Sequence, residues 1–333
     1  MNFLKNAIRE IPVLNRLYMW LRIRFDFIAQ YFHDFRMAIS YSMPMNEKKG
    51  GYRYRVLMLA HFLEKGMSYK NPRPFGVSHV KNIMRLCKYF ADAETSSFEY
   101  QVAINALFEW AKVFNNNGWK NEPVVDEVIN FLKDKVKNDI QIGVRCSADE
   151  RMNSDPPKFG EGSYLLDRHS VREYASRPLT KPDLEFATSC FRATPTACNR
   201  QLCKLYHVTN CDKKELLNLY VPGIGGLSIE TLEYFLVTFD MLGIVGAKER
   251  NQGFLNAGLA AMSFVTGLHY CNIGSCLLQW DLSGKDDRII TQKLGLPRNE
   301  RIAVVIAAGH KPEHYLIPIS ARKSIKDLCK ELD

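Results

Sequence analysis

One segment of this 333-residue chain combines side chains that suit a bound phosphate. Arg168-His169-Ser170-Val171-Arg172 places two arginines four residues apart with a hydroxyl between them. Guanidinium groups donate hydrogen bonds in a planar fork that matches phosphate, and a serine hydroxyl adds one more donor. We expect this segment to begin a helical turn. Arg-x-x-x-Arg spacing is also common on solvated surfaces, so the interpretation needs support from the rest of the chain.

Two further segments could supply polar contacts to the same ligand. Residues 193–201 contain Pro195, Thr196 and Asn199 directly ahead of an apolar run, so hydroxyl, amide and backbone groups could face a planar polar heterocycle. The alternative is an ordinary turn between a helix and a strand. Arg322, shortly after a proline near the C-terminus, adds one cation that by itself identifies nothing.

The distribution of charge argues against a nucleic-acid partner. The chain has 45 Lys and Arg against 36 Asp and Glu, a net charge of +9. Residues 1–55 hold ten basic and four acidic residues, so they carry +6, and the rest of the chain carries only +3. A nucleic-acid domain would need a basic face of its own.

The cysteines and the apolar segments indicate a cytoplasmic protein. The nine cysteines are odd in number and lack Cys-x-x-Cys spacing, so we expect neither a metal site nor a disulfide framework. We also expect no signal peptide. Residues 251–280 contain no Asp, Glu, Lys or Arg, but their polar residues and four glycines favour a buried helix over a membrane span. Such a helix implies a large core or a dimer interface.

Apolar spacing divides the chain into two parts. In residues 1–150, apolar side chains recur every three or four positions. This predicts helices at Val56–Lys65, Ser78–Ala91, Phe98–Phe114 and Val124–Val136. The polar stretch Cys146–Gly162 is typical of a linker. We place the boundary near residue 155, between a helical domain (1–155) and a second domain (156–333).

The second part alternates between strands and helices, which predicts an α/β or α+β layer architecture. Thr180 and Asp183 form a capping pattern for the first of these helices. Strands are expected at Leu202–Thr209, Tyr234–Phe239 and Ile302–Ala308, and helices at Thr180–Ala193, Asp212–Tyr220, Asn251–Tyr270 and Arg288–Leu294.

Taken in order, the motifs resemble the nitroreductase family of FMN-dependent flavoproteins. The family pattern Arg-Arg/His-Ser-x-Arg/Lys matches residues 168–172, and Pro-Ser-Ser/Ala-x-Asn-x-Gln matches residues 195–201. A long apolar helix then ends in a glycine-containing turn, here residues 272–276, and an apolar strand ends in Gly309, followed by Arg322. The resemblance covers residues 164–330. It implies an α+β fold with a mixed sheet flanked by helices, preceded by an all-α N-terminal domain.

The resemblance implies a non-covalent FMN at the interface of an intertwined homodimer. The arginine segment would hold the phosphate, the ribityl chain and the pyrimidine edge, and the proline turn would reach the flavin from the partner subunit. Backbone groups near Leu278 and Gln279 would approach flavin N5, and the helix Asn251–Tyr270 would form the dimer core. The implied flavin-binding residues are Arg168, His169, Ser170, Arg172, Pro195, Thr196, Asn199, Leu278, Gln279 and Arg322.

The implied chemistry belongs to the flavin, so no catalytic side chain and no metal ligand are expected. NAD(P)H would pass a hydride to N5, and a small oxidised acceptor (a nitro compound, a quinone or a specific metabolite) would then take its place. Two alternatives stay open. One is a narrower oxidation of a biosynthetic intermediate with oxygen as acceptor. The other is a degenerate family member that acts as a binding or membrane-associated accessory in polysaccharide biosynthesis.

Two departures from the family pattern bear on the substrate. The family's Gln-Pro-Trp is Gln201-Leu202-Cys203 here. Many members also insert helices between the strand and the long apolar helix to cover the flavin, whereas only residues 240–250 lie there in this chain. We expect the usual lid to be missing and the helical N-terminal domain to replace it.

The first 45 residues mix cations with aromatic side chains. A basic, aromatic-rich helix can lie on an anionic membrane, which would give a peripheral contact at the inner face of the membrane through residues 1–45. We favour packing against protein with the arginines reaching into solvent, because the apolar residues do not keep to one clean face.

Overall fold

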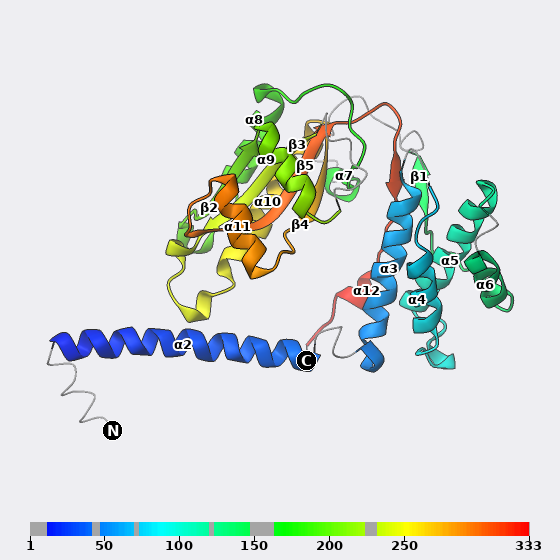
Figure 1. Ribbon diagram of the computed structural model, residues 1–333, viewed down its shortest axis with the longest axis horizontal. Coiled ribbons are helices and arrows are strands. Elements are labelled where there is room, and N and C mark those ends of the chain that lie inside the picture. Colours follow the sequence, from blue (N-terminus) through cyan, green and yellow to red (C-terminus); the bar gives the residue numbers. More distant parts are fainter. Residues whose placement is uncertain are drawn as a thin grey trace. The chain divides into compact units, whose positions relative to one another are not determined.

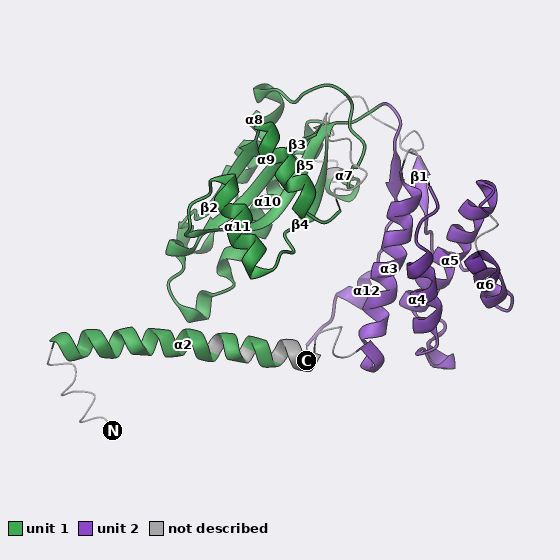
Figure 2. Cartoon of the chain, in the orientation of Figure 1, with its two compact units in different colours: residues 1–37, 153–312 green, residues 38–152, 313–333 purple. Residues whose placement is uncertain are grey.

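The computed structural model describes residues 12–41, 47–69, 73–119, 123–146, 163–223 and 232–332. The chain divides into two compact units: unit 1 contains residues 1–37 and 153–312, and unit 2 contains residues 38–152 and 313–333 (Figure 2). This division differs from the single boundary expected near residue 155, because the residues up to Met37 group with the second part of the chain and the C-terminal tail groups with the helical unit. Most of the expected linker, residues 147–162, lies outside the described residues.

A four-stranded sheet forms the centre of unit 1, in the order β2-β3-β5-β4 (Figure 1). Its strands are β2 (Cys203–Val208), β3 (Glu233–Asp240), β4 (Ile273–Gln279) and β5 (Glu300–His310), and every neighbouring pair is antiparallel. The inner strand β3 is buried from Tyr234 to Phe239. The three predicted strands are therefore present, and β4 is an additional one.

Helices cover both faces of this sheet. On one face, α10 (Gln252–Tyr270) packs against the sheet and α8 (Lys181–Arg192), and its closest approach is at Gly253. A Cβ there would lie 2.2 Å from the Phe239 ring, so only glycine permits this packing. On the other face, Tyr234 donates a hydrogen bond to Asn218 of α9 (Cys211–Tyr220), which contacts α11 (Gly284–Leu294).

The expected cap of α8 is present, since Thr180 N donates to Asp183 Oδ2 at 2.7 Å. Unit 1 also contains α7 (Ser163–Leu166) and most of the 30-residue α2 (Pro12–Tyr41), up to Met37. Helices on both faces of an antiparallel sheet confirm the expected α+β fold. No described helix is long and apolar enough to cross a membrane.

The glycine turn expected at residues 272–276 is instead the start of β4. The chain reverses just before it, at Asn272, whose φ is 57°. Gly274 then pairs with Gly309 of β5, and Ser275 pairs with Ala308. The turn interpretation fails because glycine in a strand can also mark a close approach of another segment.

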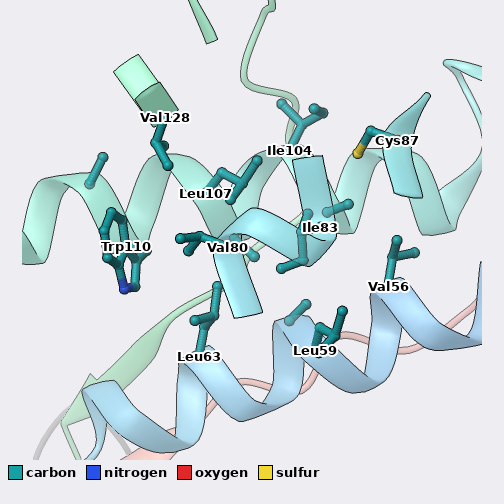
Figure 3. Close-up of a cluster of buried hydrophobic side chains, with 14 of the residues drawn as sticks. Val56, Leu59, Leu63, Val80, Ile83, Cys87, Ile104, Leu107, Trp110 and Val128 are labelled. Atoms are coloured by element: carbon teal, nitrogen blue, oxygen red, sulfur yellow. The ribbon is translucent and has the colours of Figure 1, made fainter. Parts of the chain in front are cut away.

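Unit 2 is a helical bundle with a small sheet. Each of the four predicted helices is present, as α3 (Gly51–Met67), α4 (Val77–Cys87), α5 (Phe98–Asn116) and α6 (Pro123–Leu132). Their apolar faces meet in one core, shown in Figure 3. The labelled side chains of this core come from α3 (Val56, Leu59, Leu63), α4 (Val80, Ile83, Cys87), α5 (Ile104, Leu107, Trp110) and α6 (Val128).

The C-terminal tail belongs to unit 2 because it pairs with the helical bundle there. Strand β6 (Leu316–Pro318) is antiparallel to β1 (Val144–Cys146). Beyond β6, the backbone N–H of Ser320 donates to the buried carboxylate of Glu64 at 3.2 Å, and Lys323 forms an ion pair with Glu99. The short helix α12 (Ile325–Leu328) follows. These contacts are non-local, so the apolar spacing of the sequence carries no sign of them.

Candidate functional site

The arginine segment 168–172 runs alongside β4 and does not begin a helical turn. Ser170 forms a parallel bridge with Ser275, and Val171 N donates to the carbonyl oxygen of Ser275 at 2.9 Å. Val171 is buried against Gly274, where a Cβ would lie 2.8 Å from Val171 Cγ1. The missing side chain of Gly274 therefore lets the segment dock on the sheet edge, and this docking overrides the expected helical start.

Arg172 is the buried cation of this segment. Only 9% of the residue is exposed, and its Nε has no hydrogen-bond partner in the part of the chain that the structure describes. Because buried polar groups are nearly always hydrogen-bonded, an unpaired guanidinium N–H indicates an acceptor from outside the described chain. An anionic or carbonyl-bearing cofactor such as FMN fits this requirement.

His269, in the last turn of α10, contributes to the same corner of the sheet. Its ring packs edge-on against His169, with the centroids 6.2 Å apart. Burial, reinforced by the positive charges of Lys311, His169 and Arg168, lowers the pKa of His269 to about 3. His269 is therefore neutral at physiological pH, and the positive field at this corner comes from the arginines and Lys311.

Neither His269 nor Lys311 belongs to a motif that the sequence singles out. His269 lies in the last turn of the expected apolar helix, and Lys311 lies two residues after Gly309, which ends the expected strand. In the sequence, only their titratable or cationic side chains could have marked these two residues as candidates for the site. Only the pairing of β4 with β5 brings both of them to the arginine segment.

The proline turn lies at the start of β2. Residues Ala197–Asn199 form a 3₁₀ turn in which Cys198 and Asn199 both have φ of 52°, and Gln201 has φ of 49°. Thr196 Oγ1 accepts a hydrogen bond from Gln201 N at 3.0 Å, and Gln201 Nε2 donates to Asn199 Oδ1 at 3.2 Å. Left-handed non-glycine residues cost about 1–3 kcal/mol each and cluster at functional sites, so this turn is a strained one.

Arg200 holds the proline turn in place, a role that sequence analysis missed. Its Nη1 donates to the carbonyl oxygen of Gly243 and to Glu249 Oε2 at 2.7 Å. Both acceptors lie in the short segment between β3 and α10, which forms the 3₁₀ turns η5 (Met241–Gly243) and η6 (Ala247–Glu249). The segment between β3 and α10, where the lid was expected to be missing, therefore contains only these two short turns. Its contacts with Arg200 hold the proline turn in place.

The arginine segment and the proline turn lie at opposite corners of one sheet. β4 and β2 are the two outer strands, so three strand spacings, about 14 Å, separate them. Ser275, beside the arginine segment, pairs with Ala308 of β5. At the start of β2, Cys203 pairs with Phe239 of β3, which in turn pairs with Arg301 of β5. These two positions on β5 are separated by about 23 Å along the strand. A single chain therefore does not bring these two halves of the predicted site together.

The other predicted residues divide between the two units. Leu278 and Gln279 lie on β4, opposite Val305 and Val304, so they follow Ser275 on the strand that holds the arginine segment. Nine of the ten predicted residues thus belong to unit 1, and Arg322 belongs to unit 2. In unit 2, Arg322 Nη1 donates a hydrogen bond to the carbonyl oxygen of Ser320 at 2.7 Å. The Arg322 side chain also lines a hollow of about 850 Å³.

Comparisons with known proteins bear on the middle of the chain. Residues 165–224 match the model of the nitroreductase family. No curated protein matches the chain. Similar solved structures include a Parabacteroides distasonis protein described as an NADH dehydrogenase/NAD(P)H nitroreductase, which is 20% identical over 51% of this chain and 95% of its own, with a TM-score of 0.43.

Two other solved structures are also similar to this chain. A Desulfovibrio desulfuricans protein described as a nitroreductase in complex with FMN is 17% identical over 53% of this chain and 99% of its own, with a TM-score of 0.43. An FMN-dependent nitroreductase from Clostridium difficile R20291 is 20% identical over 45% and 87%, with a TM-score of 0.38. The matched stretch, residues 165–224, contains both the arginine segment and the proline turn, and it confirms the resemblance of the C-terminal part to the nitroreductase family.

Proposed function

We propose that this protein is an FMN-dependent oxidoreductase whose flavin sites form between two copies of the chain. The observation that carries the proposal is the corner-to-corner separation of the arginine segment and the proline turn, both within the stretch that matches the nitroreductase family. Bound FMN would supply hydride transfer from NAD(P)H to a small oxidised acceptor. The unpartnered Nε of Arg172 would then find its acceptor in the cofactor.

The exposed face of α10 supports a homodimer. Phe254, Leu255, Leu259 and Met262 lie on one side of this helix and are exposed, while its other side is buried on the sheet. Two copies of α10 packed across a two-fold axis perpendicular to the helix would run antiparallel, so the end of one helix would lie beside the start of the other. α10 begins beside Phe239 and ends at the arginine corner, so this packing would bring the arginine segment of one copy to the proline turn of the other.

Each side chain of the proposed site has a defined task. Arg168, Arg172 and Lys311 would bind the phosphate and the electron-rich edge of the flavin, because guanidinium and ammonium groups pair with anions. Ser170 would add a hydroxyl donor. His269 would stay neutral beside them and so would not add repulsion among the cations.

The visible absorption spectrum of the purified full-length protein tests the cofactor. We expect the bands of oxidised flavin, or their appearance on titration with FMN, and their bleaching by NADH or NADPH under anaerobic conditions. R172A should lose flavin affinity by about tenfold to a hundredfold, since a charge-assisted hydrogen bond contributes about 1.5–3 kcal/mol. H314Q, at an exposed histidine, is the matched control. A colourless protein that does not take up FMN would instead favour the accessory role.

A mixing experiment tests the shared site. R172A damages the arginine corner and N199A damages the proline turn, so each homodimer has two defective sites. In a heterodimer of the two variants, one site is intact and the other carries both substitutions. Random mixing should therefore restore about a quarter of the flavin-binding capacity. No recovery on mixing, with both variants folded, would refute the shared site and leave the single-chain alternative.

We further propose that unit 2 takes over the role of the missing lid and shapes the acceptor site. The support is the short segment Met241–Glu249, which holds only two 3₁₀ turns. Because residues 313–333 belong to unit 2, a deletion test must remove them together with residues 38–152. The remaining protein should bind FMN but turn over acceptors with altered kinetics, and unchanged kinetics would contradict this role.

A further inference from the structure

The long helix α2 presents an apolar surface that the described chain does not cover. None of its described side chains is buried, and Leu14, Leu21, Phe25, Phe32 and Phe35 are among the exposed ones. Figure 1 shows α2 as one uninterrupted helix. Helices in water owe most of their stability to packing of an apolar face. A 30-residue helix with exposed leucines and phenylalanines therefore needs a partner surface.

The apolar side chains of α2 follow a seven-residue repeat. One set recurs at every seventh position, and a second set follows each of its first three members by four residues. The first set is Leu14, Leu21, Ile28 and Phe35, and the second set is Tyr18, Phe25 and Phe32. This alternating spacing of four and three residues is the a/d pattern of a coiled coil, and the seam it forms continues over three heptads.

The period of the seam identifies the kind of partner. A straight helix has 3.6 residues per turn, so a strict 3.5-residue repeat drifts around it unless the helix supercoils with a second helix. A flat lipid surface requires no such repeat. Asp26 also lies among the arginines of α2, which weakens its attraction for an anionic membrane, and Asp34 forms an ion pair with Arg250 of unit 1. The pattern thus favours a helix over a membrane.

The charges flanking the seam allow the partner to be a second copy of α2. The second set, Tyr18, Phe25 and Phe32, occupies the a positions of the heptads. In a parallel pair, the residue just before each a position faces the residue five positions later in the partner helix. Here Arg24 would face Ala29, and Tyr31 would face Arg36. No arginine faces another arginine in this arrangement, and the Tyr31–Arg36 contact is of the cation–π type.

The area of the seam is close to what a stable interface needs. The six described leucine, isoleucine and phenylalanine residues of the seam are each 40–65% exposed. With about 150–250 Å² for a fully exposed large side chain, they offer about 600 Å² per helix. Standard interfaces bury about 800 Å² per partner, and the flanking Leu17 and Tyr31 supply much of the difference.

We propose that α2 forms a parallel, in-register coiled coil with α2 of a second copy of this chain. The inference does not depend on the proposed flavin chemistry. It gives the basic N-terminal segment a structural role, in which the arginines flank a protein–protein seam. It also refines the expectation that the apolar residues of this segment lack one clean face: seven of them share a seam when counted in heptads, whereas Met19, Trp20 and Ile23 lie outside it.

Disulfide cross-linking of the full-length protein tests the proposal. The exposed native cysteines Cys198, Cys211 and Cys329 are first replaced by serine. Leu21→Cys and Ile28→Cys are then introduced singly and oxidised under mild conditions. In a parallel pair, each new cysteine meets its own copy, so both variants should yield at least about tenfold more covalent dimer than the outer-face control I23C.

A charged residue placed in the seam provides a second test of the coiled coil. In the L21C background, Phe25→Asp should reduce the covalent dimer about tenfold, whereas Ile23→Asp on the outer face should leave it unchanged. Helix content and thermal unfolding of each variant show whether it is folded. Cross-linking of I23C as strong as that of the seam variants would overturn the proposal. Cross-linking at only one of the two seam positions would also overturn it, because it would indicate an antiparallel pair. Cross-linking that needs vesicles containing phosphatidylserine would assign the helix to a membrane instead.

Discussion

The neutral histidine at the arginine corner makes the stability of unit 1 dependent on pH. Folding lowers the pKa of His269 from 6.5 to about 3, first by burial and then through Lys311, His169 and Arg168. Between these two pH values the unfolded chain binds more protons than the folded one. Stability is therefore complete above about pH 6.5 and is lost progressively as the pH falls toward 3.

The size of the effect follows from the shift. At pH 5, which is 1.5 units below the ordinary pKa, protonation would cost about 2 kcal/mol at about 1.4 kcal/mol per unit. The ring is partly exposed to solvent, which screens the neighbouring charges, so we expect about 1 kcal/mol. H269Q should lack this contribution, and its stability should change less between pH 7 and pH 5 than that of the wild type.

Two measurements check this prediction. The pH titration of the histidine ring signals by NMR, assigned by comparison with H269Q, should show no transition for His269 down to about pH 4. Hydrogen exchange of the β5 amides, measured at pH 7 and pH 5, should show the loss of stability at pH 5 in the wild type and in H314Q, which changes an exposed histidine and serves as the control. Adding FMN should raise the pKa of His269, because an anion offsets the neighbouring cations. A native-state titration of His269 near pH 6.5 would refute the argument.

Three further substitutions test the packing. G253A should destabilise unit 1 by about 1–3 kcal/mol, because the new Cβ would meet the Phe239 ring, whereas G284A has no atom within 4 Å and should show no such loss in thermal unfolding. E300A should cost about 1–3 kcal/mol in urea unfolding, because Glu300 is buried and the hydroxyls of a tyrosine and a buried threonine lose their acceptor, whereas the lysine that also donates to it is half exposed; a loss below about 1 kcal/mol would contradict this. W110F should cost about 1–3 kcal/mol in unit 2, because the buried ring N–H donates to a backbone carbonyl at 2.9 Å, and unchanged exchange of the α5 amides would show otherwise.

Local patterns in the sequence were sufficient for most helices and three strands. The helices of unit 2 and the apolar α10 follow directly from the spacing of their apolar residues, since burial of one face determines that spacing. The start of α8 follows from Thr180 and Asp183, because a capping box needs only residues three apart. The order of short motifs likewise indicated the nitroreductase resemblance, and residues 165–224 confirm it.

The elements that sequence reasoning missed or misplaced depend on contacts between distant residues. Strand β4 contains glycine and serine and was taken for a turn, because its pairing with β5 is not visible in its own composition. The arginine segment is extended because Gly274, about a hundred residues away, leaves room for Val171. The grouping of the C-terminal tail with unit 2 depends on β1 and on Glu64 in the same way.

The residues of the proposed site could be chosen from the sequence, but their arrangement could not. Residue types, spacing and the family resemblance identified the arginines and the proline turn, because chemistry is a property of side chains, but they did not identify Lys311. The order β2-β3-β5-β4 decided that the two segments lie at opposite corners of the sheet and that His269 and Lys311 join the arginine corner. Strand order is set by the burial of whole faces and by backbone pairing across the chain, so only the tertiary structure could decide it.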